Sequence, residues 1–403
     1  MKTVFSKLGP GFLFAGAAIG VSHLVQSTRA GADFGFGLLW ALLLINAVKY
    51  PFFQFGPRYA SATGESLLEG YKKMNKGVLV AYFVISFATM FTIQTAVTIV
   101  TAGIATSLFG TGSILLWTLI ITLVCAAILI IGKYKVLDTV MKIIVLSLTL
   151  STVVAVALAL PEANNISLQQ VIPNNAATLG FLIAFMGWMP APLDISIWNS
   201  IWTVEKQKNN PSITIKQSLF DFNTGFITTT ILAIGFLSLG ALVLFGSDET
   251  FSSKGGEFAN QLIGLYTQSL GEGTKIIIGI AALTTMFSTT LTTLDGSPRV
   301  MHRTSEILAN QTLPKGYLFW LTLLVIGTLI IFFFFVSEMS LLIQVATVLS
   351  FLTAPFYAII NYKVITGKDT PKSAQPNQTM KIYSLISIVI LIAFSVWYIT
   401  TLV

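Results

Sequence analysis

Two prolines and a carboxylate interrupt an apolar stretch near the middle of the chain. Residues 186–199 read MGWMPAPLDISIWN, and Asp194 closely follows Pro190 and Pro192. Each proline lacks a backbone N–H and clashes with the preceding helical turn, so a helix that crosses this stretch must break. The freed backbone groups beside Asp194 can hold a small ion or solute. The simpler alternatives are a kink that improves packing and a carboxylate that caps the following helix.

A second polar interruption follows an apolar run near the N-terminus. Residues 11–20 (GFLFAGAAIG) align without gaps on residues 180–189 (GFLIAFMGWM), and the first run then breaks just before His23. A histidine there can be a metal ligand, a proton carrier or a donor to an anion, or it can simply bond to a freed carbonyl. The two breaks together predict one substrate pocket, formed by Gly20, Val21, Ser22, His23, Met189, Pro190, Ala191 and Asp194.

Uncharged polar side chains in other apolar runs are further candidates. Gln94 and Gln344 could complete the coordination of a substrate in this pocket. Thr285 and Ser288 belong to a hydroxyl-rich run that could line a pathway or coordinate sodium. Such hydroxyls more often bond to carbonyls of their own helix, and that alternative stays open.

Charged residues inside or at the ends of the apolar runs predict gates. Because buried cations need partners, Arg29 and Lys49 indicate either an ion-pair network with acids such as Asp221, or a cationic vestibule that admits anions. Asp295 and Arg299 stand at the predicted end of a run. We expect a helix end and an Asp–Arg pair there.

The composition requires a lipid environment for these elements. Of the 403 residues, 54% are hydrophobic and 10% are charged, whereas soluble proteins carry about 25% charged residues. The net charge of +7 comes from Lys and Arg in short loops, as in membrane proteins, and does not indicate nucleic-acid binding. The single cysteine, Cys125, excludes a disulfide within the chain. Without a P-loop, a catalytic triad or a cofactor motif, we expect neither an enzyme nor an ATP-driven pump.

Runs of roughly 20 apolar residues predict an all-α membrane protein with about eleven spans. Lys and Arg gather in alternate loops, which places the N-terminus in the cytoplasm and the C-terminus on the external side of the cell membrane. The predicted spans are residues 9–31, 36–58, 78–108, 112–132, 135–160, 176–203, 218–246, 273–297, 316–336, 339–362 and 380–402.

Paired interruptions in corresponding places indicate two inverted repeats with a binding site at their interface. We expect a single transporter domain with one repeat over about residues 9–160 and a second over about residues 176–362. An additional helix covers about residues 380–402.

Three connecting segments also carry signals. Residues 66–71 and 256–270 are predicted to form short helices at the membrane surface. Residues 371–377 contain Pro and Asn and predict an exposed loop.

Several segments resemble the NRAMP family of divalent-metal transporters. The resemblance covers about the whole chain. It implies two inverted five-helix repeats with discontinuous first and sixth helices, and a divalent metal ion as the cargo. It rests on Gly9-Pro-Gly-Phe-Leu13, Arg29-Ala-Gly31, Gly37-Leu-Leu-Trp40, Met189-Pro190 and Gln344-Val-Ala-Thr-Val-Leu-Ser350.

The metal-binding residues of that family are only partly present. The acid of the first-helix signature corresponds to Gly20, and the Asn of that signature corresponds to His23. The sixth-helix Met is kept as Met189, but the His that should follow is Ala191. His23, Met189 and Asp194 remain as candidate metal ligands, a set that suits softer transition metals but supplies little negative charge.

These observations predict a secondary transporter that works by alternating access. The resemblance implies a divalent metal ion, and the alternative is a small anion or polar organic solute carried by the same fold. A channel or a non-transporting sensor is the third hypothesis. The expected partners are the lipid bilayer, a small ionic or polar substrate and a co-transported proton or sodium ion, with no cofactor.

Overall fold

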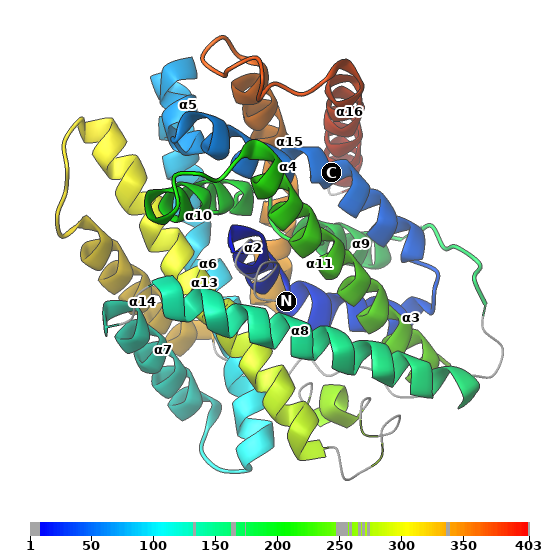
Figure 1. Cartoon of the computed structure of the whole chain (residues 1–403). Coiled ribbons are helices and arrows are strands. Elements are labelled where there is room, and N and C mark those ends of the chain that lie inside the picture. The colour runs from blue at the N-terminus through cyan, green and yellow to red at the C-terminus, as the bar shows by residue number, and fades with distance from the viewer. Residues whose placement is uncertain are drawn as a thin grey trace.

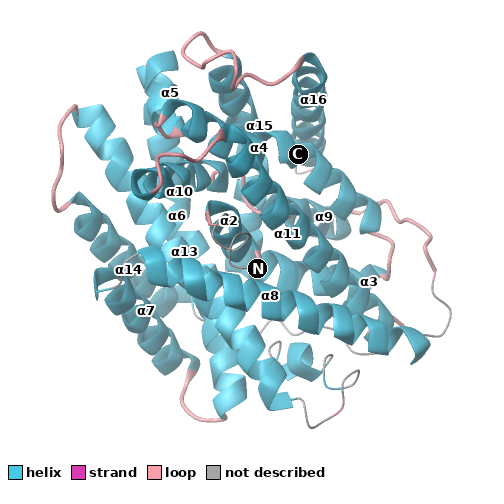
Figure 2. Ribbon diagram, viewed as in Figure 1, coloured by secondary structure: helices cyan, strands magenta, loops and turns pink. Residues whose placement is uncertain are grey.

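The computed structural model describes residues 9–131, 134–162, 167–173, 175–246, 257, 260–264, 267, 271, 275–335 and 339–401. Every regular element among these residues is a helix, as Figure 2 shows. The prediction of an all-α protein is therefore confirmed.

Two helices are interrupted where the sequence predicts breaks. The first consists of α2 (Pro10–Ala18), a π-helix (Ser22–Ser27) and α3 (Thr28–Phe34), with an irregular link before the π-helix. Pro10 occupies the first turn of α2, where its missing N–H is tolerated. The other interrupted helix consists of α9 (Ala176–Trp188) and α10 (Ile195–Asn209), and Pro190 and Pro192 lie in the link.

The remaining helices are mostly long and apolar. They are α4 (Leu39–Thr63), α5 (Leu67–Met74), α6 (Lys76–Phe109), α7 (Ile114–Ile131), α8 (Tyr134–Ala159), α11 (Ile215–Val243), α13 (Lys275–Ala309), α14 (Gly316–Phe335), α15 (Met339–Thr366) and α16 (Gln378–Thr400).

Six helices of the described part are long and apolar enough to cross a bilayer: α6, α7, α11, α14, α15 and α16. Large apolar side chains on their outer faces are exposed, for example Leu123 of α7, Phe334 of α14 and Val389 of α16. A soluble protein rarely exposes so much contiguous apolar surface, so these faces are suited to lipid. The full count of eleven spans stays a prediction.

The interrupted helices lie at the centre of the bundle. Figure 1 shows α2 surrounded by α10, α11 and α13, and each of these helices contacts it. Small residues permit the closest approaches. A Cβ atom added to Gly187 of α9 would lie 2.1 Å from the carbonyl oxygen of Thr347 on α15. A Cβ atom at Gly56 of α4 would lie 2.2 Å from the carbonyl oxygen of Ser196 on α10.

The connecting segments agree with the sequence only in part. Residues 67–71 belong to α5, and Ser66 is its N-cap, which forms a capping box with Glu69. Residues 371–377 form a loop, as predicted. Most of the predicted helix at 256–270 lies outside the described residues.

The predicted helix end at Asp295 is wrong. α13 continues through Pro298 to Ala309. Neighbouring helices compensate for a proline in such a helix. At this point Gly296 lets the ring of Trp198 pack closely, since an added Cβ atom would lie 2.4 Å from that ring.

Candidate functional site

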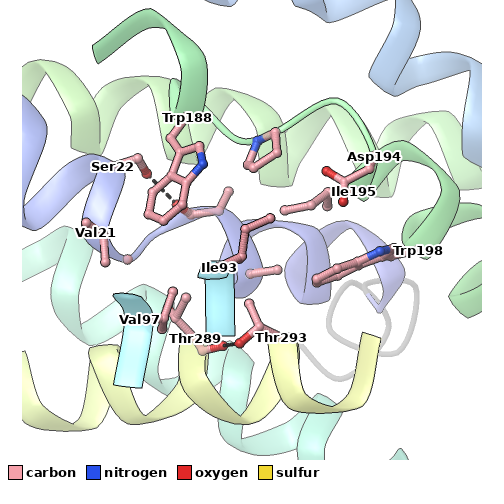
Figure 3. A pocket seen from close by; sticks show the side chains of 14 residues that line it. Val21, Ser22, Ile93, Val97, Trp188, Asp194, Ile195, Trp198, Thr289 and Thr293 are labelled. Atoms are coloured by element: carbon pink, nitrogen blue, oxygen red, sulfur yellow. Dashed lines mark hydrogen bonds between the residues drawn. The ribbon is translucent and has the colours of Figure 1, made fainter. Parts of the chain in front are cut away.

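The two helix breaks meet around a cavity in the centre of the bundle. Its volume is about 30 Å³, and it is partly open. Figure 3 shows the side chains that surround it. The lining consists of Ala17, Ala18, Gly20, Val21, Ser22, Ile93, Val97, Trp188, Pro192, Asp194, Ile195, Trp198, Thr289 and Thr293.

Apolar side chains form most of the cavity wall. Trp188 ends α9 and Trp198 lies on α10, so the two indoles flank the second break (Figure 3). Ile93 and Val97 of α6 form another part of the wall. The indole N–H of Trp188 donates to the hydroxyl oxygen of Ser350 at 2.9 Å, which fixes the ring. Such a wall suits the aliphatic or flat part of a solute.

Asp194 is the one ionisable residue in this lining. It directly precedes α10, and its side chain makes no hydrogen bond that caps the helix. The Asp194 side chain is half-buried, and Figure 3 shows it on the same side of the cavity as Ile195 and Trp198. Thr289 and Thr293 of α13 also line the cavity, and their hydroxyls donate to backbone carbonyl oxygens. The lining therefore combines one carboxylate with a mostly apolar wall.

His23 is fully buried beside the first break but is absent from the lining. Its Nε2 atom lies 3.0 Å from the carbonyl oxygen of Thr229, and its Nδ1 atom lies 2.8 Å from the hydroxyl of Ser22. Because a carbonyl oxygen only accepts, Nε2 carries a proton. Both ring nitrogens are thus engaged, and neither can bind a metal ion without losing a hydrogen bond.

Backbone carbonyl oxygens at the second break bind a cation that belongs to the protein itself, the side chain of Lys49. Lys49 lies in the middle of α4 and is 0% exposed. Its Nζ atom donates to the carbonyl oxygens of Met186 at 2.8 Å, Gly187 at 2.7 Å and Ala191 at 3.2 Å. Met189 is fully buried, and its side chain does not line the cavity.

The three candidate metal ligands do not all line the cavity. Of His23, Met189 and Asp194, only Asp194 lines the cavity. In the described part of the chain, no three His, Cys, Asp or Glu side chains are grouped so that they could hold a metal ion.

The other polar candidates lie outside the lining as well. Gln94 is buried and donates to the carbonyl oxygen of Thr290 at 3.3 Å. Gln344 is exposed on α15. Thr285 and Ser288 donate to carbonyl oxygens of their own helix at 2.7 and 2.6 Å. One turn further along α13, Thr289 faces the first break and donates to the carbonyl oxygen of Ile19 at 2.8 Å.

The predicted Asp295–Arg299 pair is present although the helix does not end there. The guanidinium donates to both carboxylate oxygens, at 2.6 and 3.0 Å. The hydroxyl of Tyr317 on α14 donates to the same carboxylate at 2.9 Å. This cluster therefore links α13 to α14.

The structure does not join Arg29 or Lys49 to Asp221. The guanidinium of Arg29 lies 5.6 Å from the ring centre of Phe181. Asp221 instead accepts the backbone N–H groups at the start of α2, and the ammonium of Lys206 lies 3.6 Å away. The carbonyl oxygens freed by the break satisfy Lys49 in place of an acid.

Sequence reasoning missed both tryptophans and the two apolar residues of α6 that line the cavity. Trp188 and Trp198 were visible within residues 186–199, on the two sides of the prolines. Bulky amphipathic rings beside a break were the signal that could have found them. Ile93 and Val97 carry no such signal, because an apolar residue in an apolar run has no distinguishing pattern.

A family model described as natural resistance-associated macrophage protein-like (Nramp) matches residues 11–401. An uncharacterized protein of Pasteurella multocida is 38% identical over 373 residues, which cover 90% of this chain and 85% of that protein. These matches concern nearly the whole sequence.

Solved structures of membrane transporters share the fold. A mutant of the Eremococcus coleocola manganese transporter superimposes with a TM-score of 0.75 at 14% identity, over 98% of this chain and 86% of that one. MhsT in complex with L-phenylalanine gives a TM-score of 0.69 at 13% identity, over 96% and 98% of the two chains. Mhp1, a nucleobase-cation-symport-1 family transporter with bromovinylhydantoin bound, gives 0.59 at 15% identity, over 98% and 93%. The predicted fold class is confirmed, and the chain belongs to the Nramp family of membrane transporters.

Proposed function

We propose that this Nramp-type transporter carries a small polar organic solute by alternating access, rather than a divalent metal ion. The observation that carries the proposal is the chemistry of the central cavity. Its lining holds one carboxylate, that of Asp194, together with the indoles of Trp188 and Trp198. The solute that fits this lining has an N–H-bearing end for Asp194 and an apolar body for the indoles.

The charge balance argues against a dication. A small divalent cation prefers several carboxylate or carbonyl oxygens, and softer metals prefer imidazole and thioether ligands. Asp194 supplies one negative charge, while the ring of His23 is engaged on both nitrogens. The ammonium of Lys49 binds the carbonyl oxygens at the break, which would otherwise attract a metal ion. A dication in the cavity would therefore be poorly neutralised.

The fold itself accommodates both kinds of cargo. One structural neighbour is a manganese transporter, whereas two others hold L-phenylalanine and bromovinylhydantoin. These similarities at low identity support the fold alone. The choice between a metal ion and an organic solute therefore rests on the residues that line the cavity. The mostly apolar lining and the two indoles resemble the surroundings of an organic ligand more than those of a metal ion.

Alternating access requires that the interrupted helices move relative to the rest of the bundle. In our proposal, α2, α3, α4, α9, α10 and α11 move against α6, α13 and their neighbours, so that the cavity opens to one side at a time. The N-terminus lies in the cytoplasm of a cell whose inner membrane holds the protein, and a proton or sodium ion accompanies the solute.

Binding to the purified transporter tests the choice of cargo. Thermal unfolding is measured in detergent with amino acids, primary amines or amides, and separately with Mn²⁺ or Co²⁺. We expect an organic solute to raise the Tm of the wild type but not of Asp194→Asn. Asp369→Asn, which changes an exposed loop acid, serves as the matched control and should respond like the wild type. Saturable binding of Mn²⁺ that Asp194→Asn abolishes would instead establish the metal hypothesis.

A further inference from the structure

A lysine ammonium occupies the end of a broken helix, where transporters of this architecture commonly bind free cations. Lys49 projects from α4 into the interior, and its whole side chain is buried. Its Nζ atom has three hydrogen-bond acceptors, the carbonyl oxygens of Met186, Gly187 and Ala191, at 2.7 to 3.2 Å. An ammonium has three N–H donors, so these carbonyls satisfy it completely.

These oxygens form a cation site because of where α9 ends. The helix stops at Trp188, so the carbonyls of Met186 and Gly187 belong to its last turn and have no partner within the helix. The C-terminal end of a helix also carries a partial negative charge. Ala191 adds a third oxygen from the irregular link. Half-helix C-termini and unwound carbonyls are the groups that hold coupling cations in transporters with broken helices.

The hydrogen-bond partners of Lys49 are all backbone carbonyl oxygens. Among the described residues, no ion pair joins its Nζ atom to an acid, and the charge of Asp194 favours the ammonium from a longer distance. Two of these carbonyls are available as acceptors because α9 ends at this point.

We propose that Lys49 is a tethered cation, which permanently fills a carbonyl cage formed by Met186, Gly187 and Ala191 and replaces a freely bound alkali or metal ion there. Two consequences follow. The α9 end of the break cannot load a metal ion while the lysine is present. The ammonium also ties α4 to the link between α9 and α10, so these elements move together whether or not an ion is bound.

Removal of the side chain should leave a vacancy that accepts small primary amines. Lys49→Ala deletes three methylene groups and the ammonium, which correspond to n-propylammonium. We expect Lys49→Ala to unfold at a lower temperature than the wild type. Addition of n-propylammonium chloride should restore at least half of the lost Tm with a saturable dose dependence. Tetrapropylammonium, which has no N–H donor and is too large for the cage, should restore none of it.

Three further variants separate this role from ordinary packing. Lys49→Met keeps a long side chain without donors and fills the vacancy, so the amine should not rescue it. Lys49→Gln supplies uncharged donors, and it should remain less stable than the wild type because the carbonyl cage selects for charge. Lys372→Ala removes an exposed lysine and should show no response to the amine.

The proposal is overturned if n-propylammonium shifts all variants equally, if Lys49→Gln matches the wild type, or if Lys49→Ala loses no stability. If Lys49→Ala cannot be purified in a folded state, it is prepared with the amine present. Recovery of folded protein only with n-propylammonium supports the cage, and failure with every amine overturns it. None of these measurements uses the transported solute, so their outcome is independent of the cargo proposed above.

Discussion

The carboxylate of Asp221 on α11 accepts the backbone N–H of Gly9 at 2.9 Å, across 212 positions of sequence. A second carboxylate oxygen accepts the N–H of Gly11 at 3.1 Å. These donors belong to the start of α2, where no partner exists within the helix. Gly11 also allows the contact, because a Cβ atom there would lie 2.1 Å from the carbonyl oxygen of Asp221. One acid thus attaches the first interrupted helix to α11.

Replacement of Asp221 by alanine should destabilise the protein. Two buried N–H groups would lose their acceptor, and an unsatisfied buried donor costs about 1–3 kcal/mol. We expect a lower Tm in detergent and faster hydrogen exchange in α2. Asp221→Asn retains one acceptor oxygen, so its Tm and its exchange rate should lie between those of the wild type and of Asp221→Ala. An unchanged exchange rate in α2 would contradict the role given to this acid.

His23 should prove structural rather than metal-binding. His23→Ala leaves the carbonyl of Thr229 and the hydroxyl of Ser22 without their ring partner. We expect a loss of about 1–3 kcal/mol of stability, with little change in the affinity for the solute. Metal analysis of purified protein after incubation with Mn²⁺ should give the same content for variant and wild type. A lower content in the variant would revive the metal hypothesis.

A side chain at position 20 should be tolerated only if the side chain of Thr289 is made smaller. A Cβ atom at position 20 would lie 2.6 Å from Cγ2 of Thr289. We expect Gly20→Ala to weaken solute binding at least tenfold, because the cavity wall must shift. The double variant Gly20→Ala/Thr289→Ala should recover part of this affinity, since the obstructing atoms are gone. Equal binding by both variants would show that the contact has no effect on the site.

The Asp295–Arg299–Tyr317 cluster should control access to the cavity. Cys125 is fully buried, so a cysteine introduced by Ser22→Cys in the cavity can be labelled over a low background. We expect Asp295→Asn to accelerate labelling of this cysteine in liposomes, because α13 and α14 lose a shared anchor. Asp369→Asn provides the comparison in an exposed loop. A rate that is unaffected by Asp295→Asn would exclude a gating role.

Hydrophobic patterning and the resemblance to the NRAMP family together predicted the fold. Long apolar runs leave few alternatives to membrane helices, and Pro190 and Pro192 lie inside the second break, between Trp188 and Ile195. Patterning was insufficient for the helix end at Asp295, because a proline does not stop a helix whose neighbours compensate for it. Where α13 continues past Asp295, the ring of Trp198 packs against Gly296, and such a long-range contact has no pattern in the local sequence.

The candidate site was predicted less completely than the fold. Asp194, Gly20 and Ser22 lie in the cavity because they are part of the breaks themselves. The partner of Lys49 was missed because its acceptors are backbone carbonyls, which every residue possesses and no sequence pattern distinguishes. Gln94 was predicted from the chemistry of its side chain alone. In the structure it bonds to Thr290 of α13, and its neighbour Ile93 lines the cavity instead.

The π-helix from Ser22 to Ser27 places an extra residue in the first interrupted helix. A π-turn contains one more residue than an α-turn, and such bulges frequently occur at functional sites. If it tightens to α-helical geometry, the segment beyond it must rotate by about 100° and advance by about 1.5 Å. A change between the two geometries would therefore rotate and shift α3 relative to α2, which Asp221 attaches to α11.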